Sequence, residues 1–225
     1  MSRIAVIIPA LNAEAGLAKT IESVAGDPVS EIVVSDGGSA DRTREIAEPL
    51  ATTIVIGPKG RGGQLRRGAE AASADWLLFL HADTVLSPSW RAVAGNFISI
   101  PTNAERAGVF TLRLDSKAPG ARRVERGANW RTRRFGLPYG DQGLLISRRL
   151  YEKTGGFRDM PLMEDVDIVR RIGKRRLHLF DAQAITSAAR YERDGWIARP
   201  ARNLFCLGLY FLGLPPSVIA RIYSR

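Results

Sequence analysis

Short apolar runs alternate with amphipathic stretches through the first eighty residues of the chain. Stretches of four or five residues with an apolar centre occur at 4–8 (IAVII), 31–35 (EIVVS), 53–56 (TIVI) and 76–80 (WLLFL). Runs of this length, apolar on both faces, predict strands that are buried on both sides. Helical stretches separate them, the first with the apolar stripe Leu17, Ile21 and Val24 and the third at 64–74. This alternation predicts an α/β fold with a parallel central sheet and right-handed crossovers.

Helix starts are marked by polar residues after the first two strands. Asn12 is the expected N-cap of the first helix, and Ser39, after the glycines of 37–38, that of the second. Beyond residue 84 the pattern is more irregular, as expected of a region that supplies loops over a site. The elements expected there are helices at 91–98, 117–134, 148–154 and 164–172 and strands at 108–114, 144–147 and 177–180.

Carboxylates stand at the ends of two predicted strands. Asp36 ends the second strand, and His81 and Asp83 follow the run 76–80. Ligands of open α/β sheets bind beyond the carboxyl ends of the strands, so these side chains are expected in the site. A carboxylate there can hold a divalent cation against a diphosphate. The alternative for Asp83 is that it caps a turn before the Ser-Pro-Ser of 87–89.

A glycine-rich basic loop precedes the third helix. Its glycines at 57, 60, 62 and 63 allow close backbone approach, and Lys59, Arg61, Arg66 and Arg67 lie nearby. A loop of this kind before a helix N-terminus suits a diphosphate, and a flexible basic turn is the alternative. The chain lacks both Gly-x-Gly-x-x-Gly after the first strand and a Gly-Lys-Ser/Thr, which argues against a dinucleotide-binding dehydrogenase and a P-loop nucleotidase.

A third acidic cluster lies at the start of the helix 164–172. Glu164, Asp165 and Asp167 are favoured there by the helix dipole, so helix capping is one interpretation. If the cluster meets Asp36 and Asp83, it supplies a general base instead.

The charge balance points to an anionic partner. Lys and Arg number 33 against 23 Asp and Glu, for a net charge of +10. Nucleic acid, anionic lipid and a phosphorylated small molecule all fit such an excess, and a solvated basic face between 113 and 149 is the alternative. Cys206 is the one cysteine, so no intrachain disulfide forms and a reducing compartment is expected.

The terminal segments bear on location. Residues 4–8 are too short for the core of a signal peptide, so a cytoplasmic location is expected. The apolar stretch 204–214 is expected to form one continuous helix, which at about 1.5 Å per residue spans about half of a bilayer of about 30 Å. Packing against the domain, a homodimer contact and a shallow peripheral contact with the inner membrane face remain as its roles.

Four ordered motifs resemble family-2 glycosyltransferases of the GT-A fold. They are VIIPALNAE at 6–14, VSDGGSADRT at 34–43, HAD at 81–83 and MEDVD at 163–167. GRGGQ at 60–64 and YGDQG at 139–143 resemble the small subgroup associated with radical-SAM and arsenosugar biosynthesis clusters. The resemblance covers about the whole chain.

This resemblance implies a single GT-A domain over 1–225 with a mostly parallel central sheet flanked by helices. Residues 1–84 would form the nucleotide-binding half, 85–195 the acceptor and catalytic half, and 196–225 an apolar C-terminal helical extension. The implied reaction is an inverting sugar transfer from a UDP- or GDP-linked donor to an unidentified acceptor, with Mg²⁺ or Mn²⁺.

The resemblance also assigns roles to residues. Asp83 would hold the metal and diphosphate, and Asp165 would be the general base, with the adjacent Glu164 as a rival base. Asp141 and Gln142 would line the acceptor side, and Arg190 of the Arg190-Tyr191 pair would reach the diphosphate. The donor-binding set is Pro9, Ala10, Glu14, Asp36, Lys59, Arg61, Gly62, Gln64, Ala82 and Asp83.

One position departs from the family pattern. The usual Asp-x-Asp is His81-Ala82-Asp83 here, so one carboxylate is missing. His81 either ligates a softer divalent ion through nitrogen or only donates a hydrogen bond, and weaker metal dependence follows.

Three other functions compete with sugar transfer. A sugar nucleotidyltransferase shares the sheet, but it would carry a glycine-rich loop where residues 9–11 read Pro-Ala-Leu. A nucleic-acid-binding protein explains the charge, yet its strand-end carboxylates would repel phosphate, so no nucleic-acid partner is expected. A non-catalytic sugar-nucleotide sensor would not need both Asp83 and Asp165.

Overall fold

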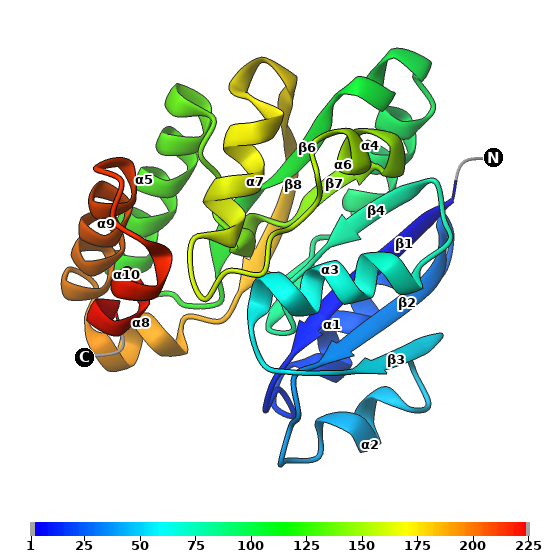
Figure 1. Ribbon diagram of the computed structural model, residues 1–225, viewed down its shortest axis with the longest axis horizontal. Helices are drawn as coiled ribbons and strands as arrows, with labels where there is room; N and C mark the ends of the chain where they lie inside the picture. Colours follow the sequence, from blue (N-terminus) through cyan, green and yellow to red (C-terminus); the bar gives the residue numbers. More distant parts are fainter. Residues whose placement is uncertain (1–2, 224–225) are drawn as a thin grey trace.

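The computed structural model describes residues 3–223, and within them an eight-stranded sheet is covered by helices on both faces (Figure 1). The strand order is β3-β2-β1-β4-β7-β6-β8-β5. The strands are β1 (Ile4–Ala10), β2 (Val29–Asp36), β3 (Thr53–Ile56), β4 (Trp76–Phe79), β5 (Thr84–Leu86), β6 (Ala107–Leu114), β7 (Leu144–Ser147) and β8 (Leu177–Thr186). The α-helices are α1 (Leu17–Val24), α2 (Thr43–Ala47), α3 (Arg61–Ala71), α4 (Trp90–Ile98), α5 (Pro119–Phe135), α6 (Arg148–Lys153), α7 (Glu164–Ile172), α8 (Ala189–Asp194), α9 (Ala198–Phe211) and α10 (Pro216–Tyr223).

The first four strands form the parallel half of the sheet, as the apolar runs predict. In the register of β1 with β2, Ile7 lies beside Val33 and Ala10 beside Asp36. On the other side of β1, Ile7 lies beside Phe79 at the end of β4. The carboxyl ends of β1, β2 and β4 therefore share one edge, which is where the strand-end carboxylates were expected to meet.

The second half of the sheet mixes directions. β7 runs antiparallel to both β4 and β6, and β5 runs antiparallel to β8. β6 and β8 are parallel, so four of the seven strand pairings are parallel. Each antiparallel pair contains a strand that follows β4 in the sequence, after the regular strand-helix alternation has ended.

The core has one layer on each face of the sheet because side chains of a strand alternate in direction. From β1, Ile4, Val6 and Ile8 pack in the layer that contains α1 and α4. Ala5 and Ile7 pack in the opposite layer with apolar residues of α3, α6 and α7. All five are fully buried, and each large side chain contributes about 1.5–3 kcal/mol by leaving water.

Two expected helix caps are wrong. Asn12 does not cap α1, which begins at Leu17; its Oδ1 accepts a 2.9 Å hydrogen bond from the backbone N–H of Ala40. Ser39 does not cap α2 either, because its hydroxyl donates to the carboxylate of Asp36. Both polar side chains join the loop after β1 to the loop after β2, which competes with capping.

The C-terminal third differs most from expectation. β8 continues six residues beyond the predicted strand and pairs with β5, which the pattern did not reveal, and α8 was also not anticipated. The stretch 204–214 is not one helix: α9 ends at Phe211, and after a turn at Gly213, with φ +87°, the chain enters α10. None of the helices described within 3–223 is long and apolar enough to cross a membrane.

Candidate active site

Two connected cavities lie at the carboxyl edge of the parallel strands. The larger has a volume of about 690 Å³ and runs along the ends of β1 and β4 and the loop before α3. The smaller, of about 120 Å³, lies between β4, the loop before β7, the start of α7 and the helices α8–α10. Seven residues line both: Arg61, His81, Asp83, Leu162, Glu164, Arg190 and Tyr223. A ligand in the larger cavity therefore reaches the mouth of the smaller one.

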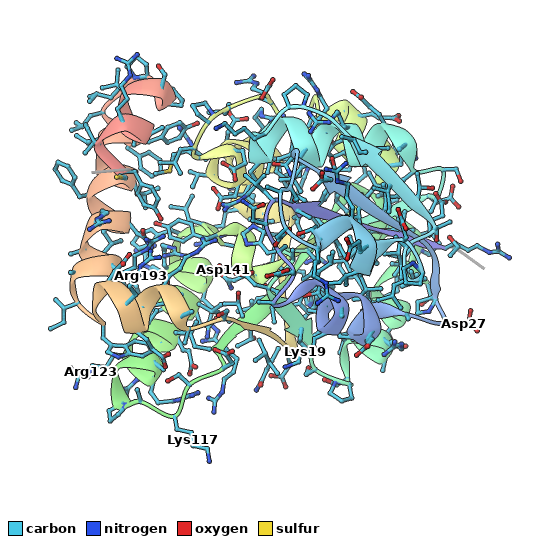
Figure 2. The ribbon with its side chains drawn as sticks, turned by 90° about the horizontal axis from the view of Figure 1, so that it is seen from below. Lys19, Asp27, Lys117, Arg123, Asp141 and Arg193 are labelled. Atoms are coloured by element: carbon cyan, nitrogen blue, oxygen red, sulfur yellow. The ribbon has the colours of Figure 1, made fainter. Side chains whose placement is uncertain are left out.

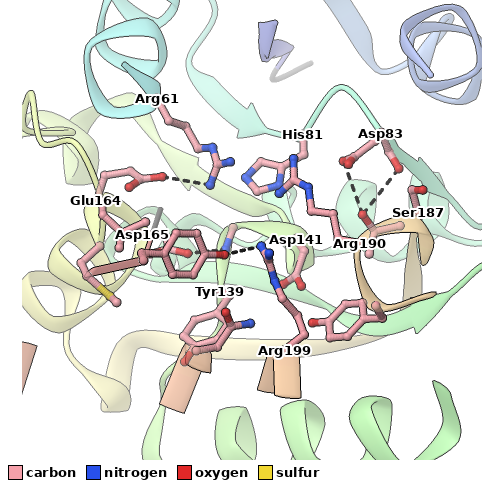
Figure 3. A pocket seen from close by; sticks show the side chains of 17 residues that line it. Arg61, His81, Asp83, Tyr139, Asp141, Glu164, Asp165, Ser187, Arg190 and Arg199 are labelled. Atoms are coloured by element: carbon pink, nitrogen blue, oxygen red, sulfur yellow. Dashed lines mark hydrogen bonds and ion pairs between the residues drawn. The ribbon is translucent and has the colours of Figure 1, made fainter. Parts of the chain in front are cut away.

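Asp83 is placed by the pairing of β5 with β8. The backbone N–H of Ser187 donates to the Asp83 carbonyl at 3.1 Å, and the Thr186 hydroxyl lies 3.4 Å from Asp83 Oδ1. The same pairing brings α8, and with it Arg190, to the mouth between the cavities (Figure 3). The carboxylate and the guanidinium that were predicted for the diphosphate thus line one wall.

His81 lies beside two arginines. Figure 3 shows the Arg61 guanidinium between Glu164 and the His81 ring, with Arg190 next to that ring. Burial lowers the pKa of His81 well below its ordinary value, and the charges of Arg61 and Arg190 lower it further. The imidazole is therefore neutral near pH 7. A neutral imidazole nitrogen is a metal ligand or a hydrogen-bond partner, and both interpretations of His81 remain.

The two acids at the start of α7 have different surroundings. Asp165 Oδ2 accepts a 2.8 Å hydrogen bond from the backbone N–H of Gly140, and Oδ1 accepts one of 2.7 Å from Val166 N–H. Glu164 is buried and forms an ion pair with Arg61, Oε1 to Nη1 3.4 Å. Burial and the neighbouring Asp165 raise the pKa of Glu164 to about 7 although Arg61 opposes the shift.

The third acid of that cluster has a structural role. The carboxylate of Asp167 accepts hydrogen bonds from Arg158 at 3.2 Å and from Arg171 at 2.6 Å. These contacts hold the segment before α7 against the helix. Asp167 lines neither cavity.

Asp141 faces the smaller cavity, where acceptor contacts were expected. Burial raises the pKa of its carboxyl to about 6, with Asp165 and Asp83 adding to the rise. Among the described residues its Oδ1 has no hydrogen-bond partner. Beside it, Tyr139 lies under the Arg131 guanidinium, 3.5 Å from Cζ to the ring centroid, and burial raises the pKa of Tyr139 to about 12.

The neighbouring Gln142 is placed differently. It is fully buried, and its amide joins the Thr132 hydroxyl, at 2.7 Å, to the Phe110 carbonyl, at 2.9 Å. The structure therefore brings Asp141 to the cavity and leaves Gln142 in the interior, and an acceptor contact of Gln142 stays a prediction.

The predicted donor residues divide into two groups. Those that line the larger cavity are Pro9, Lys59, Arg61, Gln64, Ala82 and Asp83. Ala10, Glu14, Asp36 and Gly62 do not line it. Asp36 is fully buried, and its carboxylate accepts hydrogen bonds from the backbone N–H groups of Gly38 and Ser39, both at 3.1 Å. Asp36 thus shapes the loop after β2, and its contact with a nucleoside stays a prediction.

Gln64 joins the ends of β1 and β2 to the loop before α3. Its amide nitrogen donates to the carbonyls of Ala10, at 2.7 Å, and Ser35, at 2.9 Å. Its Oε1 accepts from Gly60 N–H at 3.3 Å. The glutamine of the 60–64 motif therefore fixes the floor of the larger cavity from a buried position.

Comparison with known proteins identifies the family. A family model described as glycosyl transferase family 2 matches residues 5–101. Protein RfbJ of Shigella flexneri is 35% identical over 88 residues, which cover 38% of this chain and 68% of that protein. The chain belongs to glycosyltransferase family 2.

Another family relative is much longer than the matched region. The PGL/p-HBAD biosynthesis glycosyltransferase of Mycobacterium bovis (strain BCG / Pasteur 1173P2) is 37% identical over 90 residues, covering 36% of this chain and 35% of that protein. The chain therefore matches about a third of the length of this relative.

Solved structures show that the fold is GT-A. The M. tuberculosis glucosyl-3-phosphoglycerate synthase has a TM-score of 0.57 at 22% identity, covering 83% of this chain and 71% of that one. S. aureus TarS 1-349 has a TM-score of 0.63 at 15% identity, covering 96% and 68%. The synthase was also crystallised in complex with Mn²⁺, uridine diphosphate and glucosyl-3-phosphoglycerate, at a TM-score of 0.54 and 21% identity, covering 83% and 70%.

The residues of this family-2 member fit a divalent metal only together with a phosphate ligand. Across residues 3–223 no three His, Cys, Asp or Glu side chains lie together as a metal site. Asp83, with His81 two residues before it, faces the shared wall. Mg²⁺ is commonly held by one or two carboxylates and completed by substrate phosphates, so a single carboxylate facing a cavity for a diphosphate fits that chemistry.

Six residues that line the smaller cavity were not expected from the sequence: Leu162, Thr186, Ser187, Arg199, Asn203 and Tyr223. The buried Arg199 joins Asp194, at 2.8 Å, to the Tyr223 hydroxyl. The sequence could have indicated this residue, because an arginine in an otherwise apolar C-terminal segment requires polar partners if it is buried.

Proposed function

We propose that this protein is an inverting glycosyltransferase that moves a sugar from a nucleotide-diphosphate donor to an acceptor nucleophile. The observation that carries the proposal is the division of acids between the cavities. Asp83 lies on the wall that both cavities share, whereas Asp165 lines only the smaller one of these two. A donor in the larger cavity would thus place its reacting end opposite a carboxylate that faces the acceptor.

The larger cavity offers cations to a diphosphate. Lys59, Arg61 and Arg190 all line it, and guanidinium groups bind phosphate oxygens with charge-assisted hydrogen bonds. Asp83, and His81 if it ligates, would hold Mg²⁺ or Mn²⁺. The metal, when bound, would neutralise charge on the departing nucleotide diphosphate. The ion pair of Arg61 with Glu164 keeps that arginine at the mouth between the cavities.

Asp165 would act as the general base. Its two carboxylate oxygens each accept a hydrogen bond from a backbone N–H, and these two bonds orient the group. It would take the proton of the acceptor hydroxyl as that oxygen bonds to the anomeric carbon and the bond from this carbon to the diphosphate oxygen breaks. Attack from the face opposite the leaving group inverts the anomeric centre. Glu164 is the rival base, but its pairing with Arg61 favours a supporting role.

The donor would be a UDP- or GDP-linked sugar. The glucosyl-3-phosphoglycerate synthase that shares the fold binds uridine diphosphate with Mn²⁺, which supports a uridine nucleotide here. We also propose membership of the subgroup associated with arsenosugar biosynthesis. Its two motifs contribute to the cavity walls, Arg61 and Gln64 to the larger and residues 139–141 to the smaller.

Calorimetric titration with UDP, GDP and their common sugar conjugates, with and without Mn²⁺, tests this function. We expect one nucleotide to bind and to bind more tightly with the metal. A folded protein that binds none of them contradicts the proposal, and salt-resistant DNA binding in the same sample would favour a nucleic-acid partner. A transferase should consume the donor faster than the donor breaks down in buffer alone, whereas a sugar-nucleotide sensor should not.

A further inference from the structure

The helix α9 has two different sides. Arg199, Cys206 and Leu207 are buried against the rest of the protein. The opposite side, together with the residues that flank the helix, is exposed and entirely apolar through residues 197–213. The exposed positions, which we call the α9 face, are Ile197, Ala198, Ala201, Leu204, Phe205, Gly208, Phe211, Leu212 and Gly213.

The α9 face is unusual for a surface helix. Such helices normally turn polar side chains to water and apolar ones to the core. Here Leu204 is 56%, Phe205 57% and Leu212 79% exposed. Figure 2 shows α9 and α10 (orange to red) along one outer edge of the molecule, with side chains projecting away from the sheet. A contiguous exposed apolar face of this kind marks an interaction site.

Basic charge is concentrated in the same half of the chain. Residues 113–225 contain 23 of the 33 Lys and Arg but only 11 of the 23 Asp and Glu. Residues 1–112 contain 10 basic and 12 acidic residues, so the whole excess belongs to the second half. One of these cations borders the α9 face directly: the Arg170 guanidinium lies 4.9 Å from the ring centroid of Phe211.

We propose that the α9 face docks on the surface of an anionic lipid bilayer. An amphipathic helix that lies in the interface inserts its apolar side chains about 5–10 Å, and basic groups around it attract anionic headgroups. Leu204, Phe205 and Leu212 would enter the acyl boundary. Arg170, which borders Phe211, would lie at headgroup level. The surface thus combines apolar insertion with the charge complementary to such a membrane.

A second copy of the chain fits the same face less well. The α9 face consists of nine residues, whereas a stable protein interface uses about 20–30 residues of each partner. Pairing two copies would also bring two strongly basic halves together, which their mutual repulsion opposes.

Vesicle co-sedimentation of the full chain tests the proposal. The probes are vesicles of phosphatidylcholine alone and of an equal mixture of phosphatidylcholine and phosphatidylglycerol. We expect binding to the mixed vesicles, and at least about a tenfold loss of it in the double variant Phe205→Ser, Leu212→Ser, because two apolar side chains are lost. Ile56→Ser is the matched control, since Ile56 is 61% exposed on β3, and it should bind as the unchanged protein does.

Fluorescence of the single variant Leu212→Trp adds a readout that does not depend on loss of binding. The chain already has four tryptophans, so the emission of the unchanged protein is subtracted. We expect the remaining emission to shift to shorter wavelength with the mixed vesicles only, as the indole at 212 enters the acyl boundary. Three results would overturn the proposal: no binding to mixed vesicles, equal binding by the double variant, or loss of a dimer in that variant with no vesicle binding by either protein. All these readouts are independent of donor binding and sugar transfer.

Discussion

The backbone N–H of Gly140 donates a 2.8 Å hydrogen bond to Asp165 Oδ2, across 25 residues of sequence. Gly140 is also the point where the loop before β7 touches His81, since a Cβ there would lie 2.5 Å from His81 Nε2. Gly140 thus donates a hydrogen bond to the proposed base, and because it has no side chain its backbone can lie directly against His81 of the shared wall. The acceptor side and the donor side of the site are positioned together.

Replacing the proposed base should separate binding from chemistry. Asp165→Asn retains the shape and one oxygen acceptor but cannot accept the proton, so donor affinity should stay within about twofold. Donor consumption, with water or a supplied acceptor as nucleophile, should fall about 100-fold or more, the usual scale of general-base catalysis. Calorimetry and rate assays measure the two effects. Asp181→Asn, at an exposed position of β8, is the control.

The carboxylate on the shared wall should control the metal effect. Asp83→Ala removes the expected oxygen ligand, so Mn²⁺ should no longer strengthen nucleotide binding, and affinity in its presence should fall about tenfold or more. Chelation should weaken binding in the unchanged protein and not in the variant. If Asp83→Ala and Asp165→Asn lose donor affinity equally, the proposed division of roles is wrong.

Glu164 should make stability depend on pH. Its pKa of about 7 in the fold exceeds the ordinary value of 4.5, so the folded state holds the proton more tightly than the unfolded chain. The stability that this adds is fully present below pH 4.5 and is lost as pH rises through about 7. Glu164→Gln has no such loss. As pH rises through that window, the free energy of unfolding of the variant minus that of the unchanged protein should therefore increase by roughly 2 kcal/mol.

Urea denaturation of both proteins at several pH values measures this difference. Glu164→Gln also replaces the ion pair with Arg61 by a neutral contact, which shifts the whole curve but adds no titration near pH 7. A difference that is constant between pH 4.5 and 7.5 would contradict the raised pKa.

Close packing at Gly62 should make this position intolerant of a side chain. A Cβ on Gly62 would lie 2.1 Å from the Arg158 carbonyl oxygen, so Gly62→Ala must displace the backbone before α7. We expect a loss of about 1–3 kcal/mol, the usual cost of overpacking. Gly127→Ala is the control: a Cβ there meets nothing within 4 Å, and alanine favours the helix α5. Thermal unfolding of the two variants should shift in opposite directions.

The sequence predicted what depends on local pattern. The strands β1, β2 and β4 follow from unbroken apolar runs, and their parallel order brings Asp83 to the ligand edge. The acidic cluster in the first turn of an amphipathic helix likewise pointed to Asp165 as a candidate site residue. Each of these features is written within about ten consecutive residues.

Features that depend on distant partners could not be predicted. β5 has three residues and is a strand because β8 pairs with it, so it is too short for a hydrophobic periodicity to reveal it. Asn12 and Ser39 carry the signature of helix caps, but a loop 28 residues away offers Asn12 a different partner. Arg199 lines the cavity only because α9 folds back beside α8 and α10.

The pairing of β5 with β8 would delay the proposed sugar transfer until late in the synthesis of the chain. Thr84 and Thr186 face each other in that pairing, about a hundred residues apart in sequence, and α8 follows at once. A ribosome that has released only the region matched by the family model has made the parallel strands and Asp83, but neither Asp165 nor Arg190. A nascent or truncated chain of that length would lack the residues proposed for proton removal and for holding the leaving group. Sugar transfer would thus begin only after β8 has joined the sheet and the helices around it have folded.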